Sequence, residues 1–302
     1  MKFKGIFKSL SPWGQLVLLL GFSIFGSILF SSIWLIYSFI FTGLTSIEQA
    51  LEIPSYMRSA QLFSALGMFV FPSLVAGYLF SDSLKEYLSF RRETPISIFL
   101  ITLFLGIAFI PLINFSYVLN QQMLFPEWMS SIEEWMKIKE EEMMILTERM
   151  LYAESVSAFV MNLIVVAVLA GVGEELIFRG VGQNIVQKIV KNPHATIWIV
   201  AFIFSAIHLQ FYGFLPRFLM GACFGYLLYF TKNIWVPIFA HFVNNAFSVV
   251  TSYIYQDRFD QIEKVDTLGS GDTWWLLLVS IPVVLYLFLQ IKKLSPIEKT
   301  AS

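Results

Sequence analysis

Seven side chains that can carry protons, charge or hydrogen bonds interrupt otherwise apolar stretches of this chain. They are Glu174, Glu175 and Arg179 in GVGEELIFRG, His208 in FSAIH, and His241, Asn244 and Asn245 in HFVNN. The chain has three histidines, and two of them belong to this set. Ionisable groups in an apolar environment are costly, and those that persist usually face the protein interior and mark function. The set is therefore a candidate catalytic site.

Helical spacing predicts how these side chains are arranged. Glu175 and Arg179 are four residues apart, so Arg179 is expected to neutralise Glu175 and support the helix. Glu174 is offset from Arg179 and is left without a charge partner, which suits a general base or acid. His241 and Asn245 also share a helix face. Phe204 and His208 share one as well, which places an aromatic wall beside the imidazole.

Two chemistries fit these residue types. In the first, Glu174, His208 and His241 bind zinc, since two histidines and one carboxylate form a known catalytic zinc set, although the HExxH spacing is absent. In the second, no metal is needed. Glu174 and His208 activate a water, while His241 and Asn245 donate hydrogen bonds to the oxyanion of an attacked amide. The second chemistry is favoured because it also uses Asn245, a poor zinc ligand. A serine or cysteine nucleophile is not expected.

The composition indicates the environment of these residues. The 302 residues are 57% hydrophobic and 14% charged, with a mean hydropathy of +0.71. A soluble globular chain has about 25% charged residues. A water-soluble enzyme, a disordered chain and a basic nucleic-acid binder are therefore excluded, and an integral membrane protein remains. The lone cysteine, Cys223, excludes an internal disulfide framework.

Uncharged apolar runs predict an all-α protein with about eight transmembrane helices. A helix needs about 20 apolar residues to cross the hydrocarbon, and the runs are too long and too uniform for barrel strands. The expected spans, each with boundaries good to several residues, are 15–43, 60–80, 95–118, 157–186, 195–212, 214–231, 233–254 and 273–291.

The basic residues predict the orientation of the spans. Twelve of the 20 Lys and Arg residues fall on the side of the N-terminus and seven fall on the opposite side. Positively charged loops face the cytoplasm. Both termini are therefore expected in the cytoplasm, and the protein is expected in the plasma membrane. At about 1.5 Å per residue, Glu174 and His208 lie about 21 Å, and His241 about 14 Å, from the inner ends of three helices. All three are then near the middle of the bilayer.

The chain divides into three parts on this basis. Residues 1–154 hold the first three spans and an outer loop (119–156), whose apolar residues recur at helical spacing opposite several Glu residues. Residues 155–255 form a catalytic transmembrane core, and residues 256–302 hold an outer loop, the last span and a cytoplasmic tail. Outside the candidate site, Arg217 and Cys223 are expected to be structural.

The three motifs resemble those of a known family. EELIFR fits an EExxxR pattern, FSAIH fits FxxxH and HFVNN fits HxxxN, in that order and on successive spans. The set is similar to the intramembrane proteases related to the type II CAAX prenyl endopeptidases, in the bacterial branch called CPBP or Abi. The resemblance covers roughly residues 155–255. It implies catalytic roles for Glu174, His208, His241 and Asn245, with support from Glu175 and Arg179. It also implies an enzyme that is often described as metal-dependent.

The sequence thus predicts an intramembrane endopeptidase that hydrolyses peptide bonds of membrane-associated proteins or peptides. Its expected partners are such a substrate and the lipid bilayer, without nucleic acid. Zinc is a possible cofactor at Glu174, His208 and His241. Two alternatives are a proton- or ion-coupled transporter and a non-enzymatic immunity or scaffold protein. The first is disfavoured because no internal repeat is visible.

Overall fold

The computed structural model describes residues 3–90, 93–123, 125–256, 265 and 267–295. Regular secondary structure in these residues is entirely helical, which confirms the predicted all-α class. The bundle contains α1 (Pro12–Phe41), α3 (Pro54–Ala65), α4 (Phe71–Phe80), α6 (Ile96–Gln121), α8 (Val156–Asn162), α9 (Ala170–Glu175), α10 (Gln183–Val190), α11 (Pro193–Ala206), α12 (Phe214–Thr231), α13 (Trp235–Tyr255) and α15 (Leu276–Leu294).

Six helical stretches in the described part of the chain are long and apolar enough to cross a membrane. They are 12–41, 54–80, 96–121, 156–190, 211–231 and 276–294. The other two predicted spans are also helices, but α11 has 14 residues and reaches only about 21 Å. Helix α13 has 21 residues and carries the polar HFVNN segment. The predicted number of eight is therefore approximate, although the helices occupy the predicted segments.

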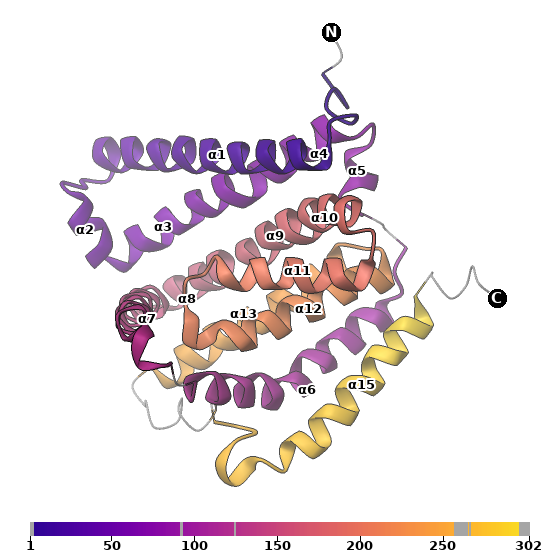
Figure 1. The fold of residues 1–302 in the computed structure, drawn as a ribbon. Helices are drawn as coiled ribbons and strands as arrows, with labels where there is room; N and C mark the ends of the chain where they lie inside the picture. The colour runs from indigo at the N-terminus through magenta and orange to yellow at the C-terminus, as the bar shows by residue number, and fades with distance from the viewer. Residues whose placement is uncertain (1–2, 91–92, 124, 257–264, 266, 296–302) are drawn as a thin grey trace.

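The helices alternate in direction, so that the start of α1 and the end of α15 lie at the same end of the bundle (Figure 1). At that end the backbone N–H of Gly5 donates to the carbonyl of Tyr78 over 3.0 Å, and that of Ile234 donates to Ser89 over 3.0 Å. These contacts join segments that the distribution of basic residues assigned to one side. The short helix α2 (Ile47–Glu52) and the longer helix α7 (Ser130–Leu151) lie at the opposite end, here called the distal end.

Close contact between backbones holds α1 against the segment between α3 and α4. That segment, η1 (Leu66–Val70), is π-helical. A Cβ added to Gly26 of α1 would overlap the carbonyl of Gly67 in η1, and a Cβ at Gly67 would overlap Gly26. Paired glycines let helices approach closely where lipid offers no hydrophobic force between them.

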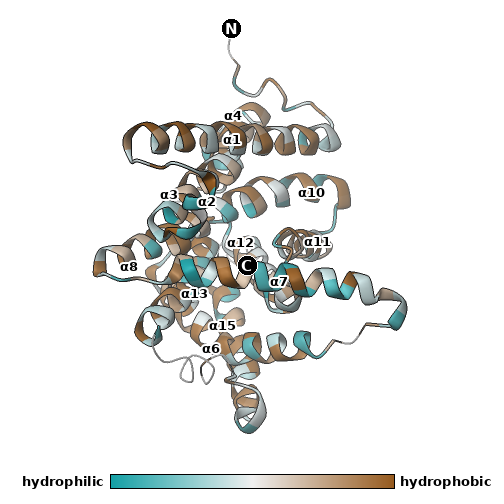
Figure 2. Ribbon diagram, turned by 90° about the vertical axis from the view of Figure 1, so that its left-hand side faces the viewer, coloured by the Kyte–Doolittle hydropathy of each residue, from teal (hydrophilic) through white to brown (hydrophobic). Residues whose placement is uncertain are grey.

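Helix α7 forms the predicted amphipathic element at the distal end. It follows the short 3₁₀ turn η2 (Glu127–Met129), which begins after Pro126. Figure 2 shows α7 as a mixture of polar and apolar residues, whereas α1 is largely apolar. Only Met136 of its apolar residues is buried, and Trp135 packs against Phe211 with ring centroids 5.3 Å apart. Most of its apolar face is therefore exposed.

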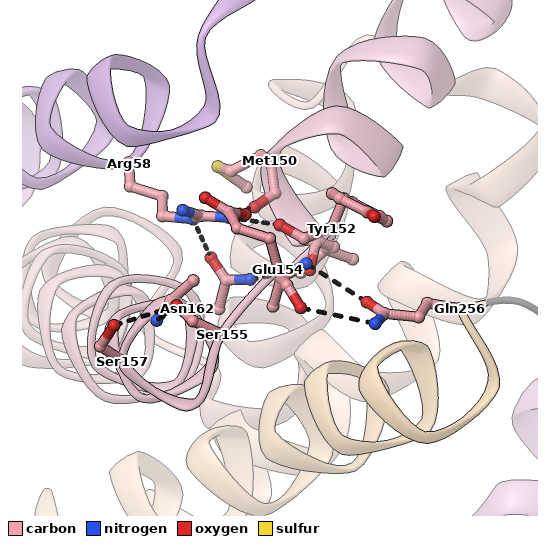
Figure 3. Close-up of polar contacts among 11 residues, drawn as sticks. Arg58, Met150, Tyr152, Glu154, Ser155, Ser157, Asn162 and Gln256 are labelled. Atoms are coloured by element: carbon pink, nitrogen blue, oxygen red, sulfur yellow. Dashed lines mark hydrogen bonds and ion pairs between the residues drawn. The ribbon is translucent and has the colours of Figure 1, made fainter.

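A buried arginine anchors the link between α7 and α8. Arg58 of α3, expected in an outer loop, is 4% exposed. Its guanidinium donates to the carbonyls of Met150 and Tyr152 and, over 2.8 Å, to Oδ1 of Asn162 (Figure 3). Glu154 lies 3.7 Å from it and is mostly exposed. We call Arg58, Asn162 and the 150–154 backbone the distal clamp.

Candidate active site

Three neighbouring elements carry the polar residues singled out in the sequence. Glu174 and Glu175 end α9, and Arg179 lies in η4 (Leu176–Gly182). His208 follows α11, and His241, Asn244 and Asn245 lie on α13. Helix α9 is flanked by two π-helical segments, η4 and η3 (Leu163–Leu169). Such segments are rare in proteins, and those that occur are often found at functional sites.

Glu175 lies at the centre of a fully buried ionic cluster. Nη1 of Arg179 donates to Oε1 of Glu175 over 2.8 Å, and neither side chain is exposed. The predicted pairing is therefore confirmed, although the segment that follows Glu175 is π-helical. Nη2 of Arg179 donates over 2.8 Å to the carbonyl of Gly221 on α12. The same Oε1 atom is 2.9 Å from Nδ1 of His241. Glu175 thus holds both Arg179 and the histidine, a link between α9 and α13 that helical spacing did not reveal.

Glu174 stands apart from this pairing, as its offset from Arg179 predicted. Its carboxylate Oε2 is 4.0 Å from Nε2 of His241, and its side chain is 14% exposed. His241 therefore lies between the two acids, with Nδ1 toward Glu175 and Nε2 toward Glu174. An approach of 4.0 Å leaves Glu174 free of a direct hydrogen bond to this imidazole.

His208 lies in a turn beyond the end of α11 rather than inside a helix. Helix α11 ends at Ala206, and Leu209 has a left-handed backbone with φ of 54°. Nδ1 of His208 is nevertheless 2.8 Å from the carbonyl of Phe204. A carbonyl only accepts, so Nδ1 carries the proton and Nε2 of a neutral ring has a free lone pair. The expected neighbour is confirmed, since the rings of Phe204 and His208 lie 5.2 Å apart.

The two asparagines of α13 form a short relay. Nδ2 of Asn244 donates to Oδ1 of Asn245 over 3.1 Å, and Nδ2 of Asn245 donates to the carbonyl of Val166 over 2.9 Å. Val166 belongs to the π-helical segment η3, so the relay links α13 to this segment. The relay fixes the amide of Asn245 and leaves one of its two N–H groups for another acceptor.

Two aromatic rings connect the parts of the site. The ring of Phe204 lies 6.1 Å from that of His241, and the guanidinium carbon of Arg179 lies 4.6 Å from its centroid. Phe224 stacks on His241 with centroids 4.9 Å apart. The rings exclude water around the ionic cluster and place His208, His241 and Arg179 around one aromatic surface. His194, at the opposite end of α11, bonds Tyr226 and lies outside this group.

The zinc set suggested by the sequence was compared with the positions of its three members. Each imidazole has its Nδ1 engaged and its Nε2 available, an arrangement that also suits a metal ligand. However, no group of three or more His, Cys, Asp or Glu side chains in the described parts of the chain is placed to hold a metal ion. Zinc at Glu174, His208 and His241 stays a prediction.

Comparison with known proteins identifies the class of this site. Residues 156–247 match the family described as type II CAAX prenyl endopeptidase Rce1-like. This segment contains all three motifs and every residue of the candidate site. The predicted relationship to the CPBP branch of these membrane proteins is therefore confirmed for the core of the chain.

Two curated relatives come from Bacillus subtilis (strain 168). A protein named "Putative membrane peptidase YdiL" is 33% identical over 95 residues, which are 32% of this chain and 38% of that protein. A protein named "Uncharacterized protein YpbD" is 28% identical over 107 residues, which are 34% of this chain and 49% of that protein. The match thus spans less than half of either relative. No solved structure matches this chain.

Proposed function

We propose that this protein is an endopeptidase of the membrane interior, which hydrolyses peptide bonds of membrane-associated proteins or peptides. The observation that carries the proposal is the arrangement around His241, whose Nδ1 is 2.9 Å from Glu175 and whose Nε2 is 4.0 Å from Glu174. The family match over residues 156–247 and the membrane-spanning helices support the same conclusion.

In the proposed mechanism, Glu174 and His208 activate the attacking water. Both offer an acceptor: the Glu174 carboxylate lacks a close hydrogen bond to His241, and Nε2 of His208 has a free lone pair. The water oxygen attacks the amide carbon as one of these groups takes its proton. The same proton then passes to the leaving nitrogen when the carbon–nitrogen bond breaks, so the two products are a carboxylic acid and an amine.

His241 and Asn245 stabilise the tetrahedral oxyanion. Asn245 offers the N–H that its bond to Val166 leaves over. His241 can donate from Nε2 when both of its ring nitrogens carry a proton, and Nδ1 then donates to the carboxylate of Glu175. Glu175 and Arg179 are positioning residues, since they act through His241. Donors aimed at a developing charge in a site without water stabilise it strongly.

Purified protein in detergent tests the proposal directly. We expect it to cleave membrane-associated peptides, and we expect the Glu174→Gln variant to be folded and inactive. Transport of ions or solute by reconstituted wild-type protein, without cleavage, would favour the transporter instead. Binding without either activity would favour a scaffold.

Metal dependence is tested on the same preparation. The metal-free mechanism predicts that cleavage persists in chelator and that elemental analysis finds no stoichiometric zinc. One tightly held zinc per chain, lost together with activity in His208→Ala, would show that the metal mechanism operates.

The proposed location is the plasma membrane, with both termini in the cytoplasm. Single cysteines at Lys4, Glu140 and Lys299 in a Cys223→Ala background test this topology. An impermeant reagent added outside intact cells should label position 140 alone. Labelling at position 4 or 299 would reverse the orientation.

A further inference from the structure

A cavity of about 850 Å³ adjoins the candidate site on its distal side. Residues of α6, α7, α12 and α13 line it. Its wall next to the site includes Phe224 and Asn244, of which Phe224 stacks on His241 and Asn244 bonds Asn245. A ligand in this cavity is therefore separated from the proposed oxyanion site by the thickness of one side chain.

Arg217, which the sequence suggested was structural, lies on the wall of this cavity. It belongs to the first turn of α12 and is only partly exposed. Nη2 donates to Oε1 of Gln210 over 2.8 Å, and Nη1 donates to the Gln210 carbonyl over 3.2 Å. Both acceptors are neutral. They hold the plane of the guanidinium in one orientation without neutralising its charge.

The second cation of the cavity differs from Arg217 in this respect. Lys137 of α7 is 2.6 Å from Glu133, which raises the pKa of Lys137 through a hydrogen bond and its charge. The ion pairs of the described residues include none with Arg217. Glu140, on the same wall, accepts instead from the backbone N–H of Tyr212 over 3.3 Å. The cavity wall also carries the carboxylates of Glu140, Glu141 and Glu148, but among the described residues Arg217 forms its hydrogen bonds with the neutral acceptors of Gln210.

Arg217 is also linked to the turn that carries His208, because both of its hydrogen bonds go to Gln210, two residues from that histidine. A partly buried guanidinium is stabilised by an anion that it can bind with two parallel hydrogen bonds, and a carboxylate has the matching geometry.

We propose that Arg217 binds a carboxylate of the substrate and so selects which peptides enter the cavity. This inference rests on the proposed peptidase function. The carboxylate can come from the C-terminus of a peptide or from an Asp or Glu side chain near the cleaved bond. The apolar residues of the cavity, among them Phe109, Ile113 and Phe247, receive the rest of the segment.

A purely structural role for Arg217 makes a different prediction. Gln210 is two residues from His208, so the bonds from Arg217 also steady the turn that carries this histidine. If that were the only role, removal of Arg217 would weaken the binding of every peptide equally. A role in binding a carboxylate changes the preference between peptides instead.

Peptide binding to the Glu174→Gln variant tests the inference without cleavage. The probes are three fluorescein-labelled apolar decapeptides of one sequence: one with a free C-terminus, one amidated, and one amidated with a glutamate before the last residue. With Arg217 present, we expect one or both of the carboxylate peptides to bind about 10- to 100-fold more tightly than the neutral peptide, as for hydrogen bonds to a charged group. Tighter binding of the peptide with a free C-terminus shows that the terminal carboxylate is used. Tighter binding of the amidated glutamate peptide shows that a side-chain carboxylate is used.

Three further variants in the same background complete the test. Arg217→Gln should reduce the affinity ratio toward one, and Lys137→Gln should leave the ratio as it was. Gln210→Ala, which removes one bond from Arg217, should shift all affinities together. Equal binding of the three peptides with Arg217 present, or a ratio unchanged in Arg217→Gln, would overturn the inference.

Cleavage by the active enzyme separates this result from the proposed function. Cleavage of all three peptides at similar rates would support the peptidase function and exclude carboxylate selection by Arg217. Selective binding of carboxylate peptides without any cleavage by the wild-type protein would support the binding site and exclude the peptidase function.

Discussion

Two arginines in the described part of the chain are buried, and their partners differ in kind. Arg179 is unexposed and bonds Glu175, which also holds His241. Arg58 is 4% exposed and bonds two backbone carbonyls and the amide of Asn162 in the distal clamp. The carboxylate nearest to Arg58, that of Glu154, is 58% exposed.

The difference shows what a buried charge does in each region. A fully buried ion pair is costly to desolvate, and its retention is weak evidence for stability alone. The pair at Arg179 also orients His241, whose other nitrogen faces Glu174, so it helps to position the candidate catalytic groups. The bonds of Arg58 satisfy backbone carbonyls at the end of α7, where the helix itself supplies no partner. They therefore hold the link between α7 and α8 in place. Four substitutions test this distinction.

The largest expected effect is on activity and comes from Glu174→Gln. The amide keeps the shape of the side chain but cannot take a proton, so the rate of cleavage should fall about 10²–10⁴-fold. Thermal unfolding in detergent should be unchanged, because Glu174 has no close hydrogen bond to His241 to lose. An active Glu174→Gln enzyme beside a folded, dead Glu175→Gln enzyme would mean that the roles of the two acids are reversed.

Arg179→Met should be the most destabilising of the four changes. It leaves the buried Glu175 carboxylate without its cation, at a cost of about 3–5 kcal/mol in unfolding free energy. The matched control is the double variant Arg179→Met, Glu175→Gln, which removes both charges. It should recover part of the loss in a double-mutant cycle. Strictly additive losses would mean that the two groups are not coupled.

Asn245→Ala should reduce turnover about 10²–10³-fold with little change in substrate affinity, as for the loss of one oxyanion donor. Asn244→Ala is the comparison variant. It removes only the bond that orients Asn245, so its effect on turnover should be smaller. Steady-state kinetics separate the two. A mild Asn245→Ala effect together with zinc release from His208→Ala would favour the metal mechanism.

Arg58→Met should have the smallest effect and should act on stability only. The carbonyls of Met150 and Tyr152 lose their donor, which costs about 1–3 kcal/mol for an unsatisfied buried group. Cleavage at the 150–155 link by an added protease should accelerate, while turnover below the unfolding temperature stays near that of wild type. A dead but stable Arg58→Met enzyme would show that the distal clamp takes part in catalysis.

The positions of the helices and the polar residues of the candidate site could be predicted from one sequence. Long uncharged runs need lipid, and polar residues inside them are too costly to be incidental, so the helical class and the three motifs followed directly. The length of α11 could not be predicted from the sequence. Apolar residues continue past Ala206, and the turn that lifts His208 out of the helix leaves no mark in hydropathy.

Helical periodicity predicted contacts between residues four positions apart, such as Glu175 with Arg179 and Phe204 with His208. Contacts between elements were decided only by the tertiary structure, because spacing along a helix says nothing about which helix packs opposite. The bond from His241 to Glu175, the burial of Arg58 against a loop about 90 residues away, and the place of Arg217 on the cavity wall are of this kind. The π-helical segments beside α9 belong here too, since packing against neighbouring helices, rather than local sequence preference, selects them.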